Sequence, residues 1–183
     1  IDSFEDNGSA FSTHELEDIE HGIEFTSGSL GYGLSLGIGT ALSGKMKGKD
    51  YRTFVLLGDG ECNEGSVWEA AMAAVRYKLD NLIAIVDKNG QQLDGYTSEV
   101  MPVHDIEKVF QGFGWNTLVI NGNDVEEIQQ AVQKRIEGIP MVIIAETIKS
   151  KGLPSIEGKT GWHHARITEE QYTEFKKELE VAR

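Results

Sequence analysis

TFVLLGDG, residues 53–60, begins with an apolar run and ends with Asp59 between two glycines. The run is short, carries no charge before Asp59 and contains β-branched residues, so it predicts a buried strand over 53–57. Gly58 and Gly60 allow the backbone to turn tightly after this strand. The sequence therefore places one carboxylate, that of Asp59, at the carboxyl end of the strand.

A helix and a second strand follow this turn. Apolar residues recur at helical spacing over 66–77, and NLIAIVD, residues 81–87, predicts another buried strand that ends close to Asn89. Two strands joined by a helix form a parallel pair, and their carboxyl ends lie at the same edge of the sheet. We therefore expect Asp59 and Asn89 to lie close together, at the edge where open α/β sheets bind ligands.

Asp59 and Asn89 together suit one kind of ligand. A carboxylate, an amide oxygen and a nearby backbone carbonyl can hold a hard divalent cation that also binds phosphate oxygens. The alternative interpretation is that Asp59 caps the following helix and Asn89 only turns the chain. A Gly-Asp-Gly triplet occurs in many turns, so the triplet alone does not decide between the two.

The alternation of strands and helices continues along the chain. We expect further strands over 114–120 and 141–145, and helices over 30–46, 103–113, 125–137 and from Thr168 onward. This pattern predicts an α/β fold in a single domain over 1–183, with a mostly parallel sheet and helices on both faces. The chain starts at Ile1 rather than Met, so we expect the domain to be N-terminally incomplete.

Small residues share one face of the helix expected over 30–46. Gly33, Gly37 and Ala41 are spaced four apart, and this spacing aligns positions along one side of a helix. The face either packs closely inside the same domain or approaches a second subunit, and both interpretations stay open.

Charge and composition exclude several classes of function. The formal net charge is −13, which argues against nucleic acid and against an anionic membrane surface as partners. No apolar run approaches the length of a membrane span, and no signal peptide is visible. The single cysteine, Cys62, excludes an internal disulfide and fits the reducing cytoplasm. We interpret Cys62 as a small buried side chain rather than a reactive thiol.

The residues at the predicted edge resemble a known cofactor motif. The Gly-Asp-Gly triplet followed by Asn89, within GDGECNEGSVWEAAMAAVRYKLDNLIAIVDKNGQQLDG (58–95), is similar to the thiamine diphosphate motif and to transketolase in particular. The resemblance runs from about residue 11 to residue 167 and covers the diphosphate-binding half of that family. It implies the thiamine diphosphate-binding fold and a Mg²⁺ or Ca²⁺ ion held by Asp59, Asn89 and the backbone carbonyl of Gln91.

The same resemblance implies which other residues meet the cofactor. Lys149 and His163 fall in segments that contact the diphosphate in transketolases; the alternative for each is an ordinary surface side chain. Gly28 and Leu30 match a turn whose backbone lines the cofactor, with Ser29 where proline is common. The full set implied for cofactor binding is Gly28, Leu30, Gly58, Asp59, Gly60, Glu61, Asn89, Lys149 and His163.

Two histidines and two glutamates complete the implied site. His14 matches a family histidine that touches the substrate near the reacting carbon, and His14 and His163 are the predicted catalytic residues; a solvent-exposed histidine is the alternative for His14. Glu64 and Glu69 resemble carboxylates at a subunit contact, where two close carboxylates would share a proton. The alternative is that they are ordinary glutamates, which are favourable in the first turn of a helix.

The resemblance implies transfer of a ketol unit between a ketose and an aldose, both sugar phosphates. In this family a glutamate from a pyrimidine-binding domain activates the cofactor, and no stretch of this sequence resembles that domain. We therefore expect a subunit that acts with a separate C-terminal, pyrimidine-binding subunit, as a cytoplasmic heterotetramer. The alternatives are the α subunit of a 2-oxoacid dehydrogenase, another thiamine diphosphate enzyme, or a non-catalytic relic of the fold.

Overall fold

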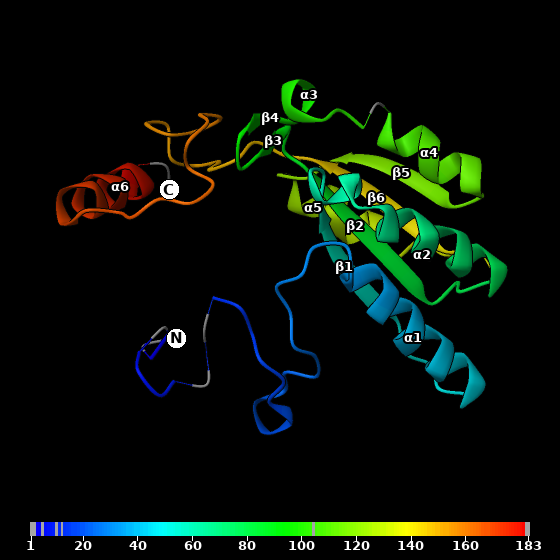
Figure 1. Cartoon of the computed structure of the whole chain (residues 1–183). Helices are drawn as coiled ribbons and strands as arrows, with labels where there is room; N and C mark the ends of the chain where they lie inside the picture. The colour runs from blue at the N-terminus through cyan, green and yellow to red at the C-terminus, as the bar shows by residue number, and fades with distance from the viewer. Residues whose placement is uncertain (1–2, 5, 10, 12, 104, 182–183) are drawn as a thin grey trace.

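The computed structural model describes residues 3–4, 6–9, 11, 13–103 and 105–181 (Figure 1). Its centre is a four-stranded sheet in the order β1-β2-β6-β5, in which every neighbouring pair is parallel. The strands are β1 (Thr53–Gly58), β2 (Leu82–Lys88), β5 (Asn116–Asn121) and β6 (Met141–Glu146). The predicted α/β fold with a mostly parallel sheet is confirmed, and the bounds of each expected strand shift by only a residue or two.

Helices lie on both faces of this sheet. The helices concerned are α1 (Gly33–Met46), α2 (Gly65–Arg76), α4 (Ile106–Phe113) and α5 (Val125–Ala131). Alternate residues of β2 enter different core clusters, because successive side chains of a strand point to opposite faces. Ala84 and Val86 pack with α1, α2 and α4, whereas Ile83 and Ile85 pack with the end of α5.

Gly37 shows how the small face of α1 is used. A Cβ atom placed on Gly37 would overlap Cγ2 of Val55 in β1, and Ala41 is fully buried. The face therefore packs on the sheet of the same chain, which is the first of the two alternatives. The helix begins at Gly33 rather than at residue 30 because Gly31 has a φ of +82°, which is not helical.

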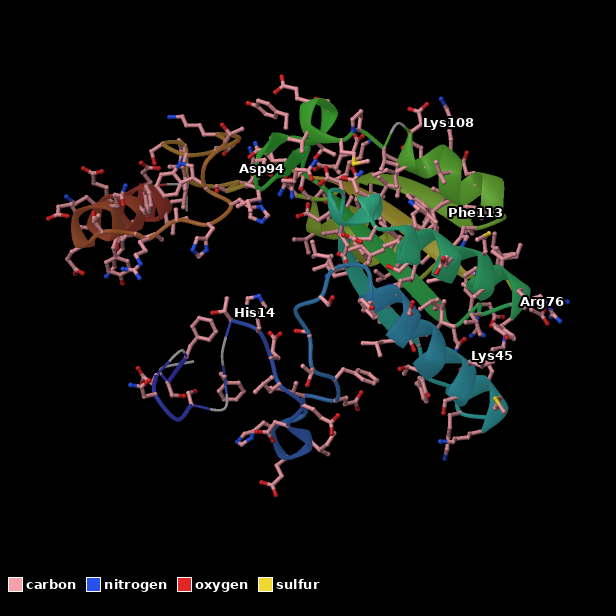
Figure 2. All side chains as sticks on the ribbon, viewed as in Figure 1. His14, Lys45, Arg76, Asp94, Lys108 and Phe113 are labelled. Atoms are coloured by element: carbon pink, nitrogen blue, oxygen red, sulfur yellow. The ribbon has the colours of Figure 1, made fainter. Side chains whose placement is uncertain are left out.

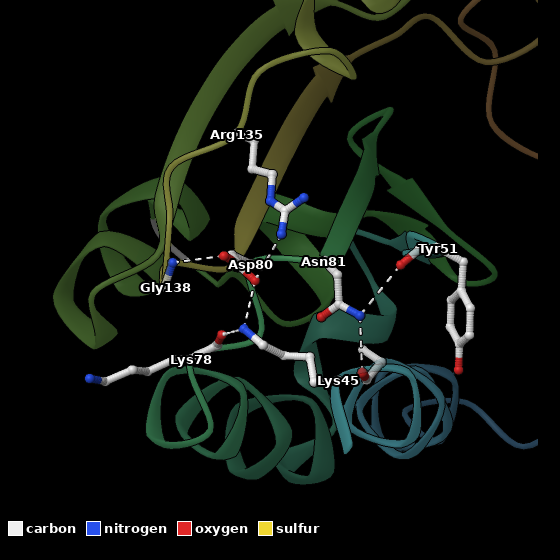
Figure 3. A network of polar contacts seen from close by, with 8 residues as sticks. Lys45, Tyr51, Lys78, Asp80, Asn81, Arg135 and Gly138 are labelled. Carbon is white, nitrogen blue, oxygen red and sulfur yellow. Dashed lines mark hydrogen bonds and ion pairs between the residues drawn. The ribbon is translucent and has the colours of Figure 1, made fainter. Parts of the chain in front are cut away.

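The chain after α5 is held by a buried carboxylate at the amino ends of the strands (Figure 3). Asp80 accepts a hydrogen bond from the N–H of Gly138 at 2.9 Å. It also forms ion pairs with Lys45 at 2.7 Å and with Arg135 at 3.3 Å, and its side chain is 5% exposed. Because Arg135 and Gly138 both reach Asp80, the chain leaves the helix at Ala131, earlier than the predicted residue 137.

The charge state of Asp80 follows from these contacts. Burial alone would raise the pKa of Asp80. The hydrogen bonds from Lys45 and Gly138 and the positive charges of Lys45 and Arg135 outweigh burial and hold this pKa below its ordinary value. Asp80 is therefore a charged group that ties α1, the start of β2 and the segment before β6 together.

Several short elements complete the described chain. They are η1 (Ile19–His21), η2 (Glu61–Asn63), α3 (Thr97–Val100) and the hairpin of β3 (Gln91–Gln92) and β4 (Gly95–Tyr96). The last helix, α6 (Glu169–Val181), begins where it was expected. Within the part of the chain that the structure describes, no helix is long and apolar enough to cross a membrane.

Candidate functional site

Asp59 lies just beyond β1, and its carboxylate faces the turn that follows β2. Its Oδ2 accepts hydrogen bonds from the N–H of Gly90 at 2.8 Å and from the hydroxyl of Thr97 at 3.4 Å. Its Oδ1 accepts from the N–H of Gly60 at 2.8 Å, and the residue is 3% exposed. The expectation that Asp59 and the turn containing Asn89 meet at one edge of the sheet is confirmed by these contacts.

The carboxylate of Asp59 occupies a place where negative charge is poorly solvated. Burial raises the pKa of Asp59 above its ordinary value, and the nearby charge of Asp87 adds to this shift. The hydrogen bonds from Gly90, Gly60 and Thr97 oppose the shift without cancelling it. A bound cation would favour the charged carboxylate, so these surroundings suit a positively charged partner.

Asn89 is held by a second carboxylate, that of Asp87, which the sequence reasoning missed. Nδ2 of Asn89 donates to Oδ2 of Asp87 at 2.9 Å, and Oδ1 of Asn89 accepts from the N–H of Gln91 at 2.9 Å. The other oxygen of Asp87 accepts a hydrogen bond from the hydroxyl of Thr147. Because a carboxylate cannot donate, Asp87 fixes which end of the Asn89 amide faces it. The two-residue spacing of Asp87 and Asn89 at the end of a strand was the available signal.

Asn89 and Lys149 line the same cleft, which has a volume of about 600 Å³. Its apolar part includes Leu56, Ile85 and Ile143 of the sheet. Its polar part consists of Asp87, Asn89, Asn123, Thr147, Lys149, Ser150 and Lys151. The structure thus brings Lys149 to the edge that carries Asn89, and the lysines supply local positive charge in a chain of net charge −13. Residues 149–159 are called the lysine loop below.

A buried donor without a partner lies beside the Gly-Asp-Gly turn. Among the described residues, Nε2 of Gln92 has no hydrogen-bond partner. A Cβ atom on Gly60 would lie 2.9 Å from Cβ of Gln92, so the turn and this side chain are in close contact. An unsatisfied buried donor costs about 1–3 kcal/mol. Such a donor is explained if an acceptor from outside the chain satisfies it.

Glu61 connects the turn of residues 28–31 to the end of β1 through hydrogen bonds. Its Oε1 accepts from the N–H of Gly31 at 2.8 Å, and its Oε2 accepts from the N–H of Gly58 at 3.0 Å. Gly28 and Leu30 line a cleft of about 490 Å³ with Glu61. Both oxygens of Glu61 are thus engaged by the backbone, and the cofactor contact expected of Glu61 stays a prediction.

The two predicted catalytic histidines lie outside the sheet. His14 is on the N-terminal segment (Figure 2), and a Cβ atom on Gly28 would lie 2.9 Å from Cδ2 of His14. His163 is exposed, in the segment between the lysine loop and α6. The structure therefore brings His14 and Gly28 together, while His163 lies outside the contacts and clefts described above.

The remaining candidates lie around the start of α2. Glu64 precedes this helix and Glu69 lies within it, and both are exposed. Their predicted place at a subunit contact stays a prediction. Cys62 is fully buried, and burial together with the charges of Glu61 and Asp59 raises its pKa to about 12. A thiol with this pKa is not reactive at neutral pH, as expected of a small buried side chain.

The donor chemistry limits which cation this edge could hold. Within the described residues, no group of three or more His, Cys, Asp or Glu side chains is arranged to hold a metal ion. A cation here would depend on one carboxylate, an amide oxygen, a backbone carbonyl and oxygens of a ligand. Such an all-oxygen set is typical of Mg²⁺ or Ca²⁺ rather than of zinc.

Comparison with known proteins shows the family of the chain. Residues 1–182 match a family model described as transketolase, thiamine diphosphate binding domain. An apulose-4-phosphate transketolase subunit from Phocaeicola vulgatus is 43% identical over 97% of this chain, which spans 64% of that protein. The 6-deoxy-6-sulfo-D-fructose transketolase subunit SqwG of a Clostridium species is 43% identical over 87% of this chain, which spans 58% of that protein.

A solved structure shows the same fold. The transketolase of Campylobacter jejuni superposes with a TM-score of 0.88 at 31% identity, over 97% of this chain and 29% of that one. The fold and the site define a thiamine diphosphate-binding domain. The chain belongs to the transketolase family.

Proposed function

We propose that this chain is the diphosphate-binding subunit of a split transketolase and takes part in ketol transfer between a ketose and an aldose. The observation that carries the proposal is the hydrogen bond between Asp59 and Gly90, which holds both parts of the motif at one edge of the sheet. Two relatives that are themselves named as transketolase subunits support it.

The residues at this edge fit a divalent cation and a diphosphate. Asp59 would supply a carboxylate oxygen, Asn89 its amide oxygen and Gln91 its backbone carbonyl, and Mg²⁺ or Ca²⁺ accepts such ligands. The buried Nε2 of Gln92, which lacks a hydrogen-bond partner, would be satisfied by an acceptor oxygen of the bound cofactor. The N–H of Gly60, which donates to Asp59 at 2.8 Å, would be shared with a phosphate oxygen.

Thiamine diphosphate supplies, when bound, an electron sink for breaking the bond beside a carbonyl. The residues of this chain would bind and orient it. Lys149 and His163 would contact the diphosphate, and the turn containing Gly28 and Leu30 would support the ring. His14, which lies beside Gly28, would bind hydroxyl groups of the substrate.

A partner chain belongs to this proposal. A separate C-terminal, pyrimidine-binding subunit would supply the glutamate that activates the cofactor, in a cytoplasmic heterotetramer. Glu64 and Glu69, which are exposed around the start of α2, would lie at the contact between subunits. We propose sugar phosphates as substrates; one relative is named for apulose-4-phosphate and another for 6-deoxy-6-sulfo-D-fructose.

The test combines the full-length protein with a candidate pyrimidine-binding subunit. Ketol transfer between sugar phosphates is expected only from the mixture, in the presence of thiamine diphosphate and Mg²⁺. Asp59→Ala should abolish Mg²⁺-dependent cofactor binding, measured by calorimetry, together with activity. Asp50→Ala changes an exposed acid away from the site and should leave both intact.

Other outcomes would point to the other functions. Full activity from this protein alone would contradict the split arrangement. Decarboxylation of a 2-oxoacid without ketol transfer would favour the α subunit of a dehydrogenase. Cofactor binding that is lost in Asp59→Ala, but is never accompanied by turnover with any partner, would favour a relic of the fold.

A further inference from the structure

The side chain of Gln91 joins two parts of the site that are far apart in the sequence. Gln91 is 7% exposed, and its Nε2 donates to the backbone carbonyl of Gly158 at 2.8 Å, across 67 positions. Its backbone N–H donates to Oδ1 of Asn89 at 2.9 Å. One residue therefore touches both a proposed metal ligand and the lysine loop.

The lysine loop is closed on itself, so a contact at one end affects the other. The N–H of Gly158 donates to the carbonyl of Lys149 at 2.9 Å. Lys151 and Glu157 form an ion pair at 2.7 Å, and the N–H of Gly152 donates to the same carboxylate at 3.2 Å. Because Gly158 is hydrogen-bonded directly to the backbone of Lys149, a change in the position of Gly158 affects where the Lys149 backbone lies.

We propose that the side chain of Gln91 couples occupation of the metal site to the position of Lys149. The inference rests on the proposed function, in which the backbone carbonyl of Gln91 is a metal ligand. A metal that fixes this carbonyl also restricts the side chain of Gln91, and through Gly158 it orders the lysine loop. Coupling of this kind is reciprocal, so an ordered loop also favours the metal. Gln91 is thus a positioning residue for the lysine.

Two variants separate coupling from metal binding. Gln91→Met keeps the length of the side chain and the backbone carbonyl but removes the donor. Gln91→Glu keeps the shape and places a carboxylate against the carbonyl of Gly158. Gln111→Met, on an exposed position of α4, is the matched control and should behave as the wild type.

Hydrogen exchange of residues 149–159 measures the coupling in the complex of the full-length protein with its pyrimidine-binding subunit, with and without Mg²⁺ and thiamine diphosphate. In the wild type, the ligands should slow exchange of the loop. In Gln91→Met and Gln91→Glu this ligand-dependent slowing should shrink about threefold to tenfold, as expected for the loss of one hydrogen bond. Calorimetry should still detect Mg²⁺ binding in both variants, and unchanged exchange of residues 82–88 in β2 shows that they are folded.

A purely structural role for Gln91 would speed exchange of the loop equally with and without ligands. Ligand-dependent slowing that is the same in wild type and variants overturns the coupling and leaves the proposed function standing. Failure of the wild-type complex to bind Mg²⁺ and thiamine diphosphate overturns the proposed function, and the coupling with it.

Discussion

Asp87 accepts a hydrogen bond from the side-chain amide of Asn89 at 2.9 Å, while its second carboxylate oxygen is occupied by the hydroxyl of Thr147. Asp87 is half-buried and follows Val86, the last buried residue of β2, and Thr147 follows β6. The contact therefore locks the carboxyl ends of two neighbouring strands and presents the Asn89 amide in one orientation. Asp87 is therefore a positioning residue, which acts on the site by orienting the side chain of Asn89.

Asp87→Asn should weaken Mg²⁺ binding about 10- to 100-fold, the usual loss when the partner of a metal ligand is changed. An asparagine offers one acceptor oxygen in place of two, so either Asn89 loses its acceptor or the hydrogen bond with Thr147 has to reverse its direction. Calorimetric titration with Mg²⁺ and thiamine diphosphate measures the effect. Thr147→Val removes only one of the two donors and should cause a smaller loss. Unchanged affinity in Asp87→Asn would show that Asn89 needs no such orientation.

Glu61→Gln should loosen the turn of residues 28–31 and lower the free energy of unfolding by about 1–3 kcal/mol. The glutamine amide group would place a donor against the N–H of Gly31 or Gly58, which both donate to Glu61 in the structure. Urea denaturation gives the stability change. Glu99→Gln, on an exposed position of α3, is the control. Equal midpoints for the two variants would rule out the supporting role of Glu61.

Two glycines of α1 should respond in opposite directions to alanine. Gly37→Ala should destabilise the protein by about 1–3 kcal/mol because its Cβ would overlap Cγ2 of Val55. Gly39→Ala meets nothing within 4 Å, so the better helix propensity of alanine should stabilise the protein by up to about 1 kcal/mol. Thermal unfolding compares the two variants. A stabilising Gly37→Ala would disprove the close packing of α1 on β1.

Because of Asp80, the free energy of unfolding should decrease as the pH falls into the acid range. Its contacts hold its folded-state pKa below the ordinary value, so its stabilisation is complete above the unfolded pKa of about 3.9 and is lost as the pH falls through the lower, folded-state value. Asp80→Asn removes the buried partner of Lys45 and Arg135, whose side chains are 36% and 47% exposed, and should cost about 1–3 kcal/mol at pH 7. The difference in free energy of unfolding between wild type and variant should become smaller below about pH 4.

Denaturation curves between pH 2.5 and pH 7 test this pH dependence. Asp50→Asn, at an exposed position, should follow the wild type at every pH. If the difference in free energy of unfolding between wild type and Asp80→Asn stays constant with pH, the charge of Asp80 is not the source of the stabilisation.

Local patterns were enough to place most of the fold and the centre of the site. The apolar run before Asp59 and the run before Asn89 are each shorter than a helix needs and rich in β-branched residues, so both predicted strands. A helix between two strands makes the pair parallel, which already implies that Asp59 and Asn89 share one edge. The contact between Asp59 and Gly90 at 2.8 Å agrees with that geometry.

Contacts between distant segments could not be obtained in this way. Thr147 meets Asp87 across 60 positions, and Gln91 meets Gly158 across 67. Both pairings depend on β6 lying next to β2 in the order β1-β2-β6-β5, and no periodicity in the sequence specifies which strand becomes a neighbour. The early end of α5 also depends on a contact between distant segments, because Arg135 forms an ion pair with Asp80 that exists only in the folded chain. Periodicity and turn chemistry act over a few residues, whereas strand order follows from how the whole core is buried.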